Sequence, residues 1–340
     1  MTKDIDRRQF GLGLGAGALA LAAGAPARAA GPLKIRVGWV VAPSSLAPLI
    51  EAKRDILKHV GKSYEMEALH FEGTPLLITG LASGELDIGG MAFSAFGLAI
   101  QNAQMTDLRI ISDESEDGVP GFATNEFMVL KDSPIKSIAD LKGKVLATNT
   151  VGSAVDIGMR ALLKKNGLEF KRDYTIIETP FPTMKAMLSS KKADLVSAVP
   201  PFSLDPELRG MARTLFTQKD AFGVSILGTW VAHKAFIDAN RPQLVDFLED
   251  VIRVIRWYQD PKNHEEAVGL LSKIIHQPPE RLQWAFTNQD QTRDKNGMPN
   301  LEAIQSNLND MKAVGQLNID IDVKKYADTS LVQEAAKRLG

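Results

Sequence analysis

Hydroxyl side chains and glycines recur in the sequence where a strand-like segment gives way to a helix-like one. These loops are residues 42–45, 72–74, 92–94, 149–153, 179–182 and 200–203. The first turn of a helix has main-chain N–H groups without partners and carries about half a unit of positive charge. Loops of this kind suit an oxyanion, which hydroxyl groups can also bind. For each hydroxyl taken singly, plain capping of the helix is an equal alternative.

We expect two of these loops to hold a compact anionic group between them. Gly152 lets the main chain approach a ligand closely, and Ser153 adds a hydroxyl donor at the start of a helix. Thr74 opens a helix in the same way in the other half of the chain. The apolar walls for an organic remainder are expected from three phenylalanines of the loops, Phe93, Phe181 and Phe202.

The residue types do not predict a catalytic or metal centre. The sequence has no cysteine, and its five histidines are scattered outside these loops, which removes cysteine nucleophiles and thiolate metal sites. The acidic run at 113–117 lacks the alternation of a calcium loop, so we expect a solvated loop that points outward. Residues 294–297 (Asp-Lys-Asn-Gly) are expected to form a turn. We therefore expect no enzymatic activity, no metal and no cofactor.

The segments that position these loops alternate between strand-like and helix-like patterns, which is typical of an α/β fold with mostly parallel sheets. Strands are expected at 34–41, 64–71, 86–89, 108–112, 144–148, 195–199 and 223–232. Ser44 and Ser45 are expected to cap a helix that runs toward Lys58, and Ser137 with Asp140 predicts a capping box. Residues 243–258 have apolar side chains at helical spacing, which indicates core packing.

One motif occurs twice. Pro75, Leu81 and Asp87 return as Pro182, Leu188 and Asp194, each 107 residues later. In both copies a strand-like segment precedes the proline and the aspartate begins the next strand. The repeat predicts two similar β-α-β units, one in each half of the chain, although two unrelated amphipathic units can also look alike.

Residues 1–29 have the pattern of a signal peptide. Arg7, Arg8 and Phe10 precede an uncharged run at 11–25, which is shorter than the roughly 20 residues of a transmembrane helix. A small-x-small cleavage pattern follows, so we predict a twin-arginine signal and export without a lipid anchor. Without the signal's four basic and two acidic residues, the chain retains 36 basic and 39 acidic residues, a formal charge of −3. This balance argues against nucleic acid as a partner.

Four segments, in the same order, resemble a known family. The stretch 132–144 (DSPIKSIADLKGK) is similar to a hallmark segment of the sulfonate, taurine and nitrate class of periplasmic binding proteins, which are related to thiamine-pyrimidine synthase-like proteins. Residues 35–39 (IRVGW), 81–89 (LASGELDIG) and 151–153 (VGS) also fit. The resemblance implies two α/β lobes with a ligand cleft between them. It carries binding positions to Ser44 or Ser45, Gly73, Thr74, Phe93, Ser94, Gly152 and Ser153, and more loosely to Phe202 and Trp230.

Loop chemistry and resemblance together predict a set of ligand contacts: Ser44, Ser45, Gly73, Thr74, Phe93, Ser94, Thr150, Gly152, Ser153, Phe181, Phe202 and Trp230. Two features depart from the family, since Pro200 and Pro201 stand where many members have an acidic or aromatic residue, and no arginine matches a sulfonate clamp. The lobes are expected at 33–126 with 223–340, and at 127–222.

We therefore predict a monomeric periplasmic solute-binding protein that delivers a small anionic molecule, a sulfonate or carboxylate, to an ABC-type permease. Two alternatives stay open. One is an enzyme related to thiamine-pyrimidine synthase, which would need a reactive side chain in the cleft. The other is a ligand sensor that docks on a membrane receptor, which the neighbouring genes could distinguish from a transport protein.

Overall fold

The computed structural model describes residues 31–340. The predicted signal peptide at 1–29 lies outside the described residues. Within them, no helix is both long and apolar enough to cross a membrane. All of the elements below belong to the unit Pro32–Gly340.

The first of two sheets has the strand order β2-β1-β3-β10-β4. Its strands are β1 (Leu33–Trp39), β2 (Tyr64–His70), β3 (Ile88–Met91), β4 (Leu108–Asp117) and β10 (Ser225–His233). β1 pairs in parallel with both β2 and β3, with Val37 opposite Ala68 and Ile88. β10 runs antiparallel to β3 and β4, so four strands share one direction and one opposes them.

The second sheet repeats this arrangement with the order β7-β6-β8-β5-β9. Its strands are β5 (Glu126–Leu130), β6 (Val145–Thr148), β7 (Thr175–Glu178), β8 (Leu195–Ala198) and β9 (Ala212–Thr217). β6 is parallel to β7 and β8, whereas β5 is antiparallel to β8 and β9. The chain passes from the first sheet to the second after β4 and returns after β9. The predicted lobe boundaries at 126 and 222 stay a prediction.

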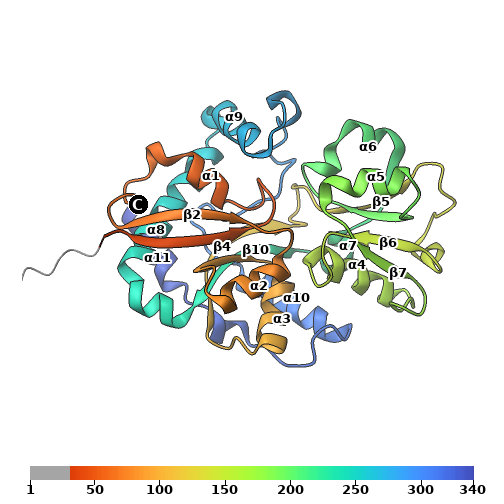
Figure 1. The fold of residues 1–340 in the computed structure, drawn as a ribbon, viewed down its shortest axis with the longest axis horizontal. Coiled ribbons are helices and arrows are strands. Elements are labelled where there is room, and N and C mark those ends of the chain that lie inside the picture. Colours follow the sequence, from red (N-terminus) through yellow and green to blue (C-terminus); the bar gives the residue numbers. More distant parts are fainter. Residues whose placement is uncertain (1–30) are drawn as a thin grey trace, which may run out of the picture. The chain divides into compact units, whose positions relative to one another are not determined.

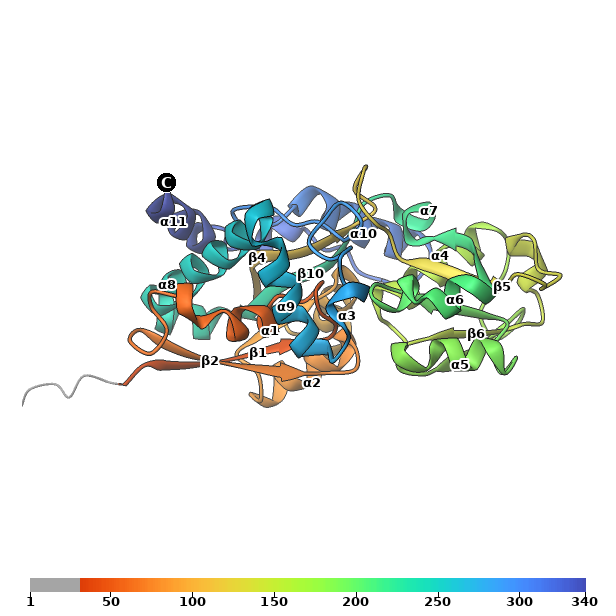
Figure 2. The same cartoon turned by 90° about the horizontal axis from the view of Figure 1, so that it is seen from above.

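Helices flank both sheets (Figures 1 and 2). Those beside the first sheet are α1 (Ala47–Ala52), α2 (Thr74–Ser83), α3 (Phe93–Ala103), α8 (Lys234–Gln259), α9 (His264–Ile275), α10 (Leu301–Ala313) and α11 (Ser330–Leu339). Those beside the second are α4 (Ala154–Lys165), α5 (Met184–Ser189), α6 (Pro206–Met211) and α7 (Gln218–Phe222). Short 3-10 helices η1 (Arg54–Ile56), η2 (Ile138–Leu141), η3 (Phe181–Thr183), η4 (Phe202–Leu204), η5 (Pro261–Asn263), η6 (Pro279–Arg281) and η7 (Val323–Tyr326) join them. The predicted α/β class is confirmed.

The repeated motif has the same hydrogen bonds in both sheets. The Asp87 carboxylate accepts the Arg36 main-chain N–H over 2.9 Å, and the Asp87 N–H donates to the Arg36 carbonyl over 3.0 Å. Asp194 forms the equivalent pair with Val145, over 2.9 and 2.7 Å. Each aspartate therefore fastens the start of one strand to the parallel strand beside it. The two β-α-β units are equivalent in their bonding as well as in their sequence.

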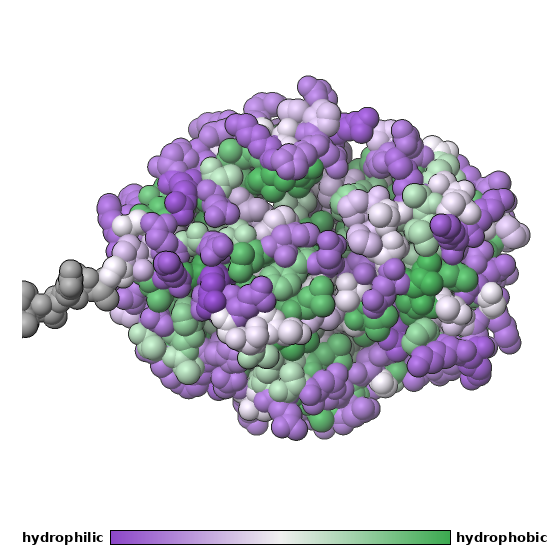
Figure 3. All heavy atoms as spheres, viewed as in Figure 1, coloured by the Kyte–Doolittle hydropathy of each residue, from purple (hydrophilic) through white to green (hydrophobic). Residues whose placement is uncertain are grey.

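Apolar side chains cover both faces of the first sheet. Trp230 of β10 is fully buried and stacks on Phe247 of α8, with 5.2 Å between ring centroids. Tyr64 meets the same phenylalanine edge-on at 5.3 Å. This confirms that residues 243–258 pack into the core, Tyr258 included. Figure 3 shows the opposite character outside, where hydrophilic residues cover most of the outline of the face drawn.

Candidate ligand-binding site

A pocket lies at the carboxyl ends of the parallel strands, where loops of both sheets meet. It encloses about 530 Å³ of empty space, part of it open to solvent. Ligands of open α/β sheets bind in this position. The apolar lining consists of Val40, Val41, Gly90, Ala92, Ala154, Val155, Phe181, Val199 and Leu227. The polar lining consists of Ser44, Ser45, Thr74, Ser115, Asn125, Asn149, Ser153 and Gln291. In the described part of the chain, the lining thus has no charged side chain.

Five of the predicted contact residues line this pocket: Ser44, Ser45, Thr74, Ser153 and Phe181. The strand ends bring them together, since each follows a parallel strand of its sheet. Ser44 and Ser45 do not cap a helix as predicted, because Leu46 precedes α1 and the helix ends at Ala52. Their hydroxyls are engaged elsewhere: that of Ser44 donates to Gln291, and that of Ser45 accepts the Val40 N–H over 3.3 Å.

The structure does not place the other seven predicted residues on the pocket wall: Gly73, Phe93, Ser94, Thr150, Gly152, Phe202 and Trp230. Phe93 and Ser94 are fully buried, and the Phe93 ring packs edge-on against Phe222 at 5.3 Å. Trp230 belongs to the core described above. Phe202 lies behind the wall, stacked on Phe181 at 6.2 Å between centroids. Gly73 and Thr150 touch each other so closely that a Cβ on Gly73 would collide with the Thr150 hydroxyl.

The helix start at Gly152 and Ser153 is already occupied by the protein's own groups. The Gly152 N–H donates to the Asp156 carboxylate over 2.8 Å, and the Ser153 hydroxyl donates to Asn149 over 2.8 Å. The Ser153 oxygen also accepts the Asp156 N–H at 3.3 Å, which is an N-cap. Asp156 is fully buried, and this burial raises its pKa. An anion at this turn would have to replace a carboxylate that is already bound there.

Three polar lining residues were not predicted from the sequence: Ser115, Asn125 and Gln291. A fourth, Asn149, lies in the predicted loop 149–153 but was not among the predicted contacts. Ser115 lies in β4, Asn125 directly before β5, and Gln291 between η6 and α10. Ser44 donates to the Gln291 carbonyl oxygen, and the Gln291 amide donates to the Asn125 carbonyl oxygen over 3.0 Å. No sequence motif marks this chain of amides, because 166 residues separate Asn125 from Gln291.

The acidic run at 113–117 is buried, so the prediction of a solvated outward loop is wrong. These residues extend β4, pair with β10, and meet the C-terminal segment through Glu116 and Thr292. Main-chain N–H groups receive the carboxylates: Leu46 donates to Glu114 over 3.0 Å, and Asn125 donates to Asp117 over 2.8 Å. Hydrogen bonds of this kind allow a carboxyl group to lie inside a protein. The predicted turn at 294–297 is confirmed, with Gly297 donating to the Asp294 carbonyl.

Burial raises the pKa values of these acids. It brings the pKa of Glu114 to about 7 and that of Asp117 to about 7, although hydrogen-bond donors act in the opposite direction. Burial also raises the pKa of Asp290, which lies outside this run, to about 6. The Glu114 carboxylate fits only because Gly90 and Gly228 face it, since a Cβ on Gly228 would lie 2.7 Å from its Oε2. The floor of the pocket therefore covers carboxyl groups that titrate near neutral pH.

A buried arginine, Arg293, stands behind the pocket among these acids. Its guanidinium donates to the carbonyls of Glu114, Pro43 and Ser44 over 2.6, 2.9 and 3.0 Å. It also donates to the Tyr258 hydroxyl over 2.8 Å. No sequence motif marks Arg293. It does not line the pocket, but its bonds to the Pro43 and Ser44 carbonyls position the loop that carries Ser44.

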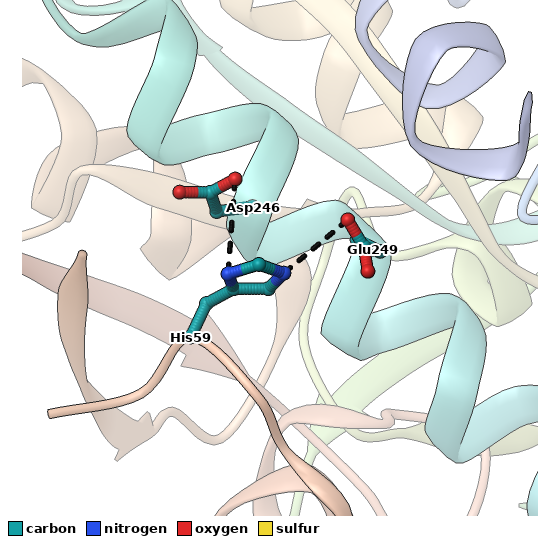
Figure 4. Close-up of side chains that lie close together, drawn as sticks. All are labelled: His59, Asp246 and Glu249. Carbon is teal, nitrogen blue, oxygen red and sulfur yellow. Dashed lines mark ion pairs between the residues drawn. The ribbon is translucent and has the colours of Figure 1, made fainter. Parts of the chain in front are cut away.

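His59, Asp246 and Glu249 form a separate cluster of potential metal ligands (Figure 4). The His59 nitrogens lie 3.9 Å from Asp246 and 3.2 Å from Glu249. Arginines already neutralise both carboxylates: Arg338 lies 2.8 Å from Asp246, and Arg253 binds Glu249. The charges of the cluster are balanced without a metal ion, so it is an ion-pair network between α8, α11 and the loop before β2. None of the three residues lines the pocket.

Solved structures share this fold at low sequence identity. The alkanesulfonate-binding protein SsuA from Xanthomonas axonopodis pv. citri, bound to MOPS, matches with a TM-score of 0.67 and 19% identity, over 88% of this chain and 100% of its own. The nitrate-binding protein NrtA from Synechocystis PCC 6803 matches with a TM-score of 0.70 and 20% identity, over 91% and 89%. The desulfurization enzyme DSZB matches with a TM-score of 0.61 and 13% identity, over 91% and 100%.

A search of curated proteins found no match. The model of the NMT1-like family, in contrast, matches residues 28–272. This range includes every strand of both sheets and most of the pocket lining, but it ends before Gln291 and Arg293. Because the match extends over more than half of the sequence, the chain belongs to the NMT1-like family.

Proposed function

We propose that this protein binds a small organic solute outside the cytoplasmic membrane and delivers it to an ABC-type importer. The observation that carries the proposal is a pocket whose walls come from the loops of two equivalent sheets. A wall from each side allows a ligand to be enclosed when two lobes close. The periplasmic sulfonate- and nitrate-binding proteins of the same fold support this assignment.

The lobes of this proposal are residues 33–126 with 223–340, and residues 127–222. A contact between the loops favours a closed arrangement, since the Asn149 amide donates to the Glu72 carbonyl over 3.3 Å. Helix α4, which flanks the second sheet, also contacts α3 and α10, which flank the first. The protein would act as a monomer, with the permease as its membrane partner. Transport is favoured over catalysis because the described lining residues offer no acid, base or cysteine to react with a substrate.

The ligand is proposed to be a small sulfonate or carboxylate. The pocket combines apolar walls with hydroxyl and amide groups, so it suits a molecule with one polar end and an organic remainder. In a screen of the mature protein, one of these compounds should raise the melting temperature. At 100 times its Kd, a ligand adds about 2.7 kcal/mol to the free energy of unfolding. Phe181→Ala should reduce the shift, whereas Phe170→Ala, outside the lining, should not. A protein stabilised by organic cations alone would contradict the proposed ligand class.

Export is proposed to follow the twin-arginine route. Replacing Arg7 and Arg8 together by lysines is expected to leave the precursor in the cytoplasm, because this route reads the paired arginines. Cell fractionation followed by immunoblotting measures the distribution. A matched variant, Lys3→Arg, should be exported like the wild type. Normal export of the double-lysine variant would show that another signal is in use.

A further inference from the structure

The pocket lining contains a residue whose hydrogen-bonding groups are satisfied by the protein except for one. The Asn125 N–H donates to Asp117 over 2.8 Å, and its main-chain carbonyl accepts the Gln218 N–H over 2.9 Å. Its side-chain carbonyl accepts the Gln291 amide over 3.0 Å. Among the described residues, no group accepts a hydrogen bond from the Asn125 side-chain NH2, and Asn125 lines the pocket. This donor is therefore available to a ligand in the pocket.

The polar side chains near Asn125 either bond to the protein already or can accept as well as donate. On the second-sheet side, Asn149 and Ser153 are bonded to each other, and the Asn149 amide also donates to the Glu72 carbonyl. In the part of the chain that the structure describes, the buried Thr74 hydroxyl has no partner, and the Ser115 hydroxyl also belongs to the pocket lining. A hydroxyl rotates to donate or to accept, so these two fit either kind of ligand group. An amide NH2 can only donate.

We propose, on the basis of the function proposed above, that Asn125 determines ligand specificity by donating to an oxygen acceptor of the ligand. Gln291 holds the carbonyl side of the Asn125 amide and thereby turns the NH2 into the pocket. The sulfonate or carboxylate oxygen then lies beside Asn125, Thr74 and Ser115, and the organic remainder faces Val155 and Phe181. This assigns the anion to Asn125, at the crossover between the sheets, instead of to the main-chain N–H groups of the turn at Gly152 and Ser153.

The test measures the Kd of ethanesulfonate, propionate and nitrate by isothermal titration calorimetry on the mature protein. Asn125→Ala removes the donor and is expected to weaken binding of the best of these probes roughly 10- to 100-fold, the range for a hydrogen bond to a charged group. Asn125→Asp replaces the NH2 by an acceptor of the same shape and should weaken it further. Asn102→Ala is the matched control, because Asn102 is exposed in α3 and does not line the pocket. We expect less than a threefold change there.

Each outcome bears on the inference. Melting curves without ligand identify variants that fold, and Asn125→Ser supplies a smaller polar replacement if Asn125→Ala or Asn125→Asp unfolds. If folded Asn125 variants bind the probe within threefold of the wild type, or if Asn102→Ala loses as much affinity, the role of Asn125 is refuted and the proposed function stands. If the wild type binds none of the three probes, the proposed ligand class is refuted and this inference falls with it.

Discussion

Replacing Arg293 by methionine is expected to lower the free energy of unfolding by about 3–5 kcal/mol, the usual cost of removing one partner from a buried ionic group. The Arg293 guanidinium satisfies three main-chain carbonyls and the Tyr258 hydroxyl. It also lowers the pKa of Glu114 and of Asp290 against the effect of burial. Methionine fills similar space but leaves these acceptors without a donor. Urea denaturation at pH 7 measures the loss.

Arg281→Met is the matched control, since Arg281 is exposed and its side chain forms no hydrogen bond or ion pair within the described residues. Surface substitutions of this kind change stability by about 0.5 kcal/mol or less. Arg293→Met should also weaken ligand binding, because the Ser44 loop loses its anchor. An Arg293→Met protein as stable as the control would show that the buried acids do not depend on this cation.

The free energy of unfolding is expected to fall by several kcal/mol between pH 5 and pH 8, the summed effect of carboxyls with raised pKa values. Glu114 has a pKa of about 7 in the folded protein against an ordinary value of 4.5, and Asp117 about 7 against 3.8. Each pKa difference corresponds to about 3–4 kcal/mol of free energy of unfolding. At a pH between the ordinary and the raised pKa, the folded state binds more protons than the unfolded state. The stabilisation is therefore complete below the ordinary pKa and disappears as the pH rises through 7.

The acids with lowered pKa values do not cancel this trend. Asp55, Asp140, Asp173 and Asp205 titrate below their ordinary value of 3.8, outside the range from pH 5 to pH 8. Their contribution is lost only in stronger acid.

Glu114→Gln isolates one of the raised groups. The variant keeps the shape of the protonated acid, so the free energy of unfolding should change little at pH 5 and increase by about 3 kcal/mol at pH 8. Urea midpoints at four pH values give the slope. The exposed Glu85→Gln should keep the wild-type slope. An unchanged slope in Glu114→Gln would place the pH dependence elsewhere in the molecule.

Local patterns predicted what depends on local structure. Strand ends followed by small polar residues located Ser44, Ser45, Thr74 and Ser153 at the pocket, because the carboxyl ends of parallel strands meet at one edge of a sheet. The repeat at Asp87 and Asp194 predicted equivalent units, because in both copies the aspartate bonds the main chain of the neighbouring parallel strand. The predicted capping box of Ser137 and Asp140 is also confirmed.

Contacts between distant segments could not be predicted in this way. An acidic run such as that at 113–117 normally indicates a solvated loop. The burial of this run depends on Gly90, Gly228 and Arg293, which lie up to 180 residues away in the sequence. The anion-binding position expected at Gly152 is occupied by the carboxylate of Asp156, four residues along the chain. A carboxylate in the first turn of a helix bonds the same N–H groups as a bound anion would. Neither outcome follows from residue type and spacing alone.

The late position of Arg293 has a consequence for the order of synthesis. Translation proceeds from the N-terminus, and the last strand of either sheet, β10, ends at His233. Gln291 and Arg293 leave the ribosome about 60 residues after that. Until then the acids of β4 lack their buried cation, and the loop of Ser44 lacks its anchor. A nascent chain thus has all the strands of both sheets before its pocket has all of its walls, and binding competence depends on a segment made after the sheets.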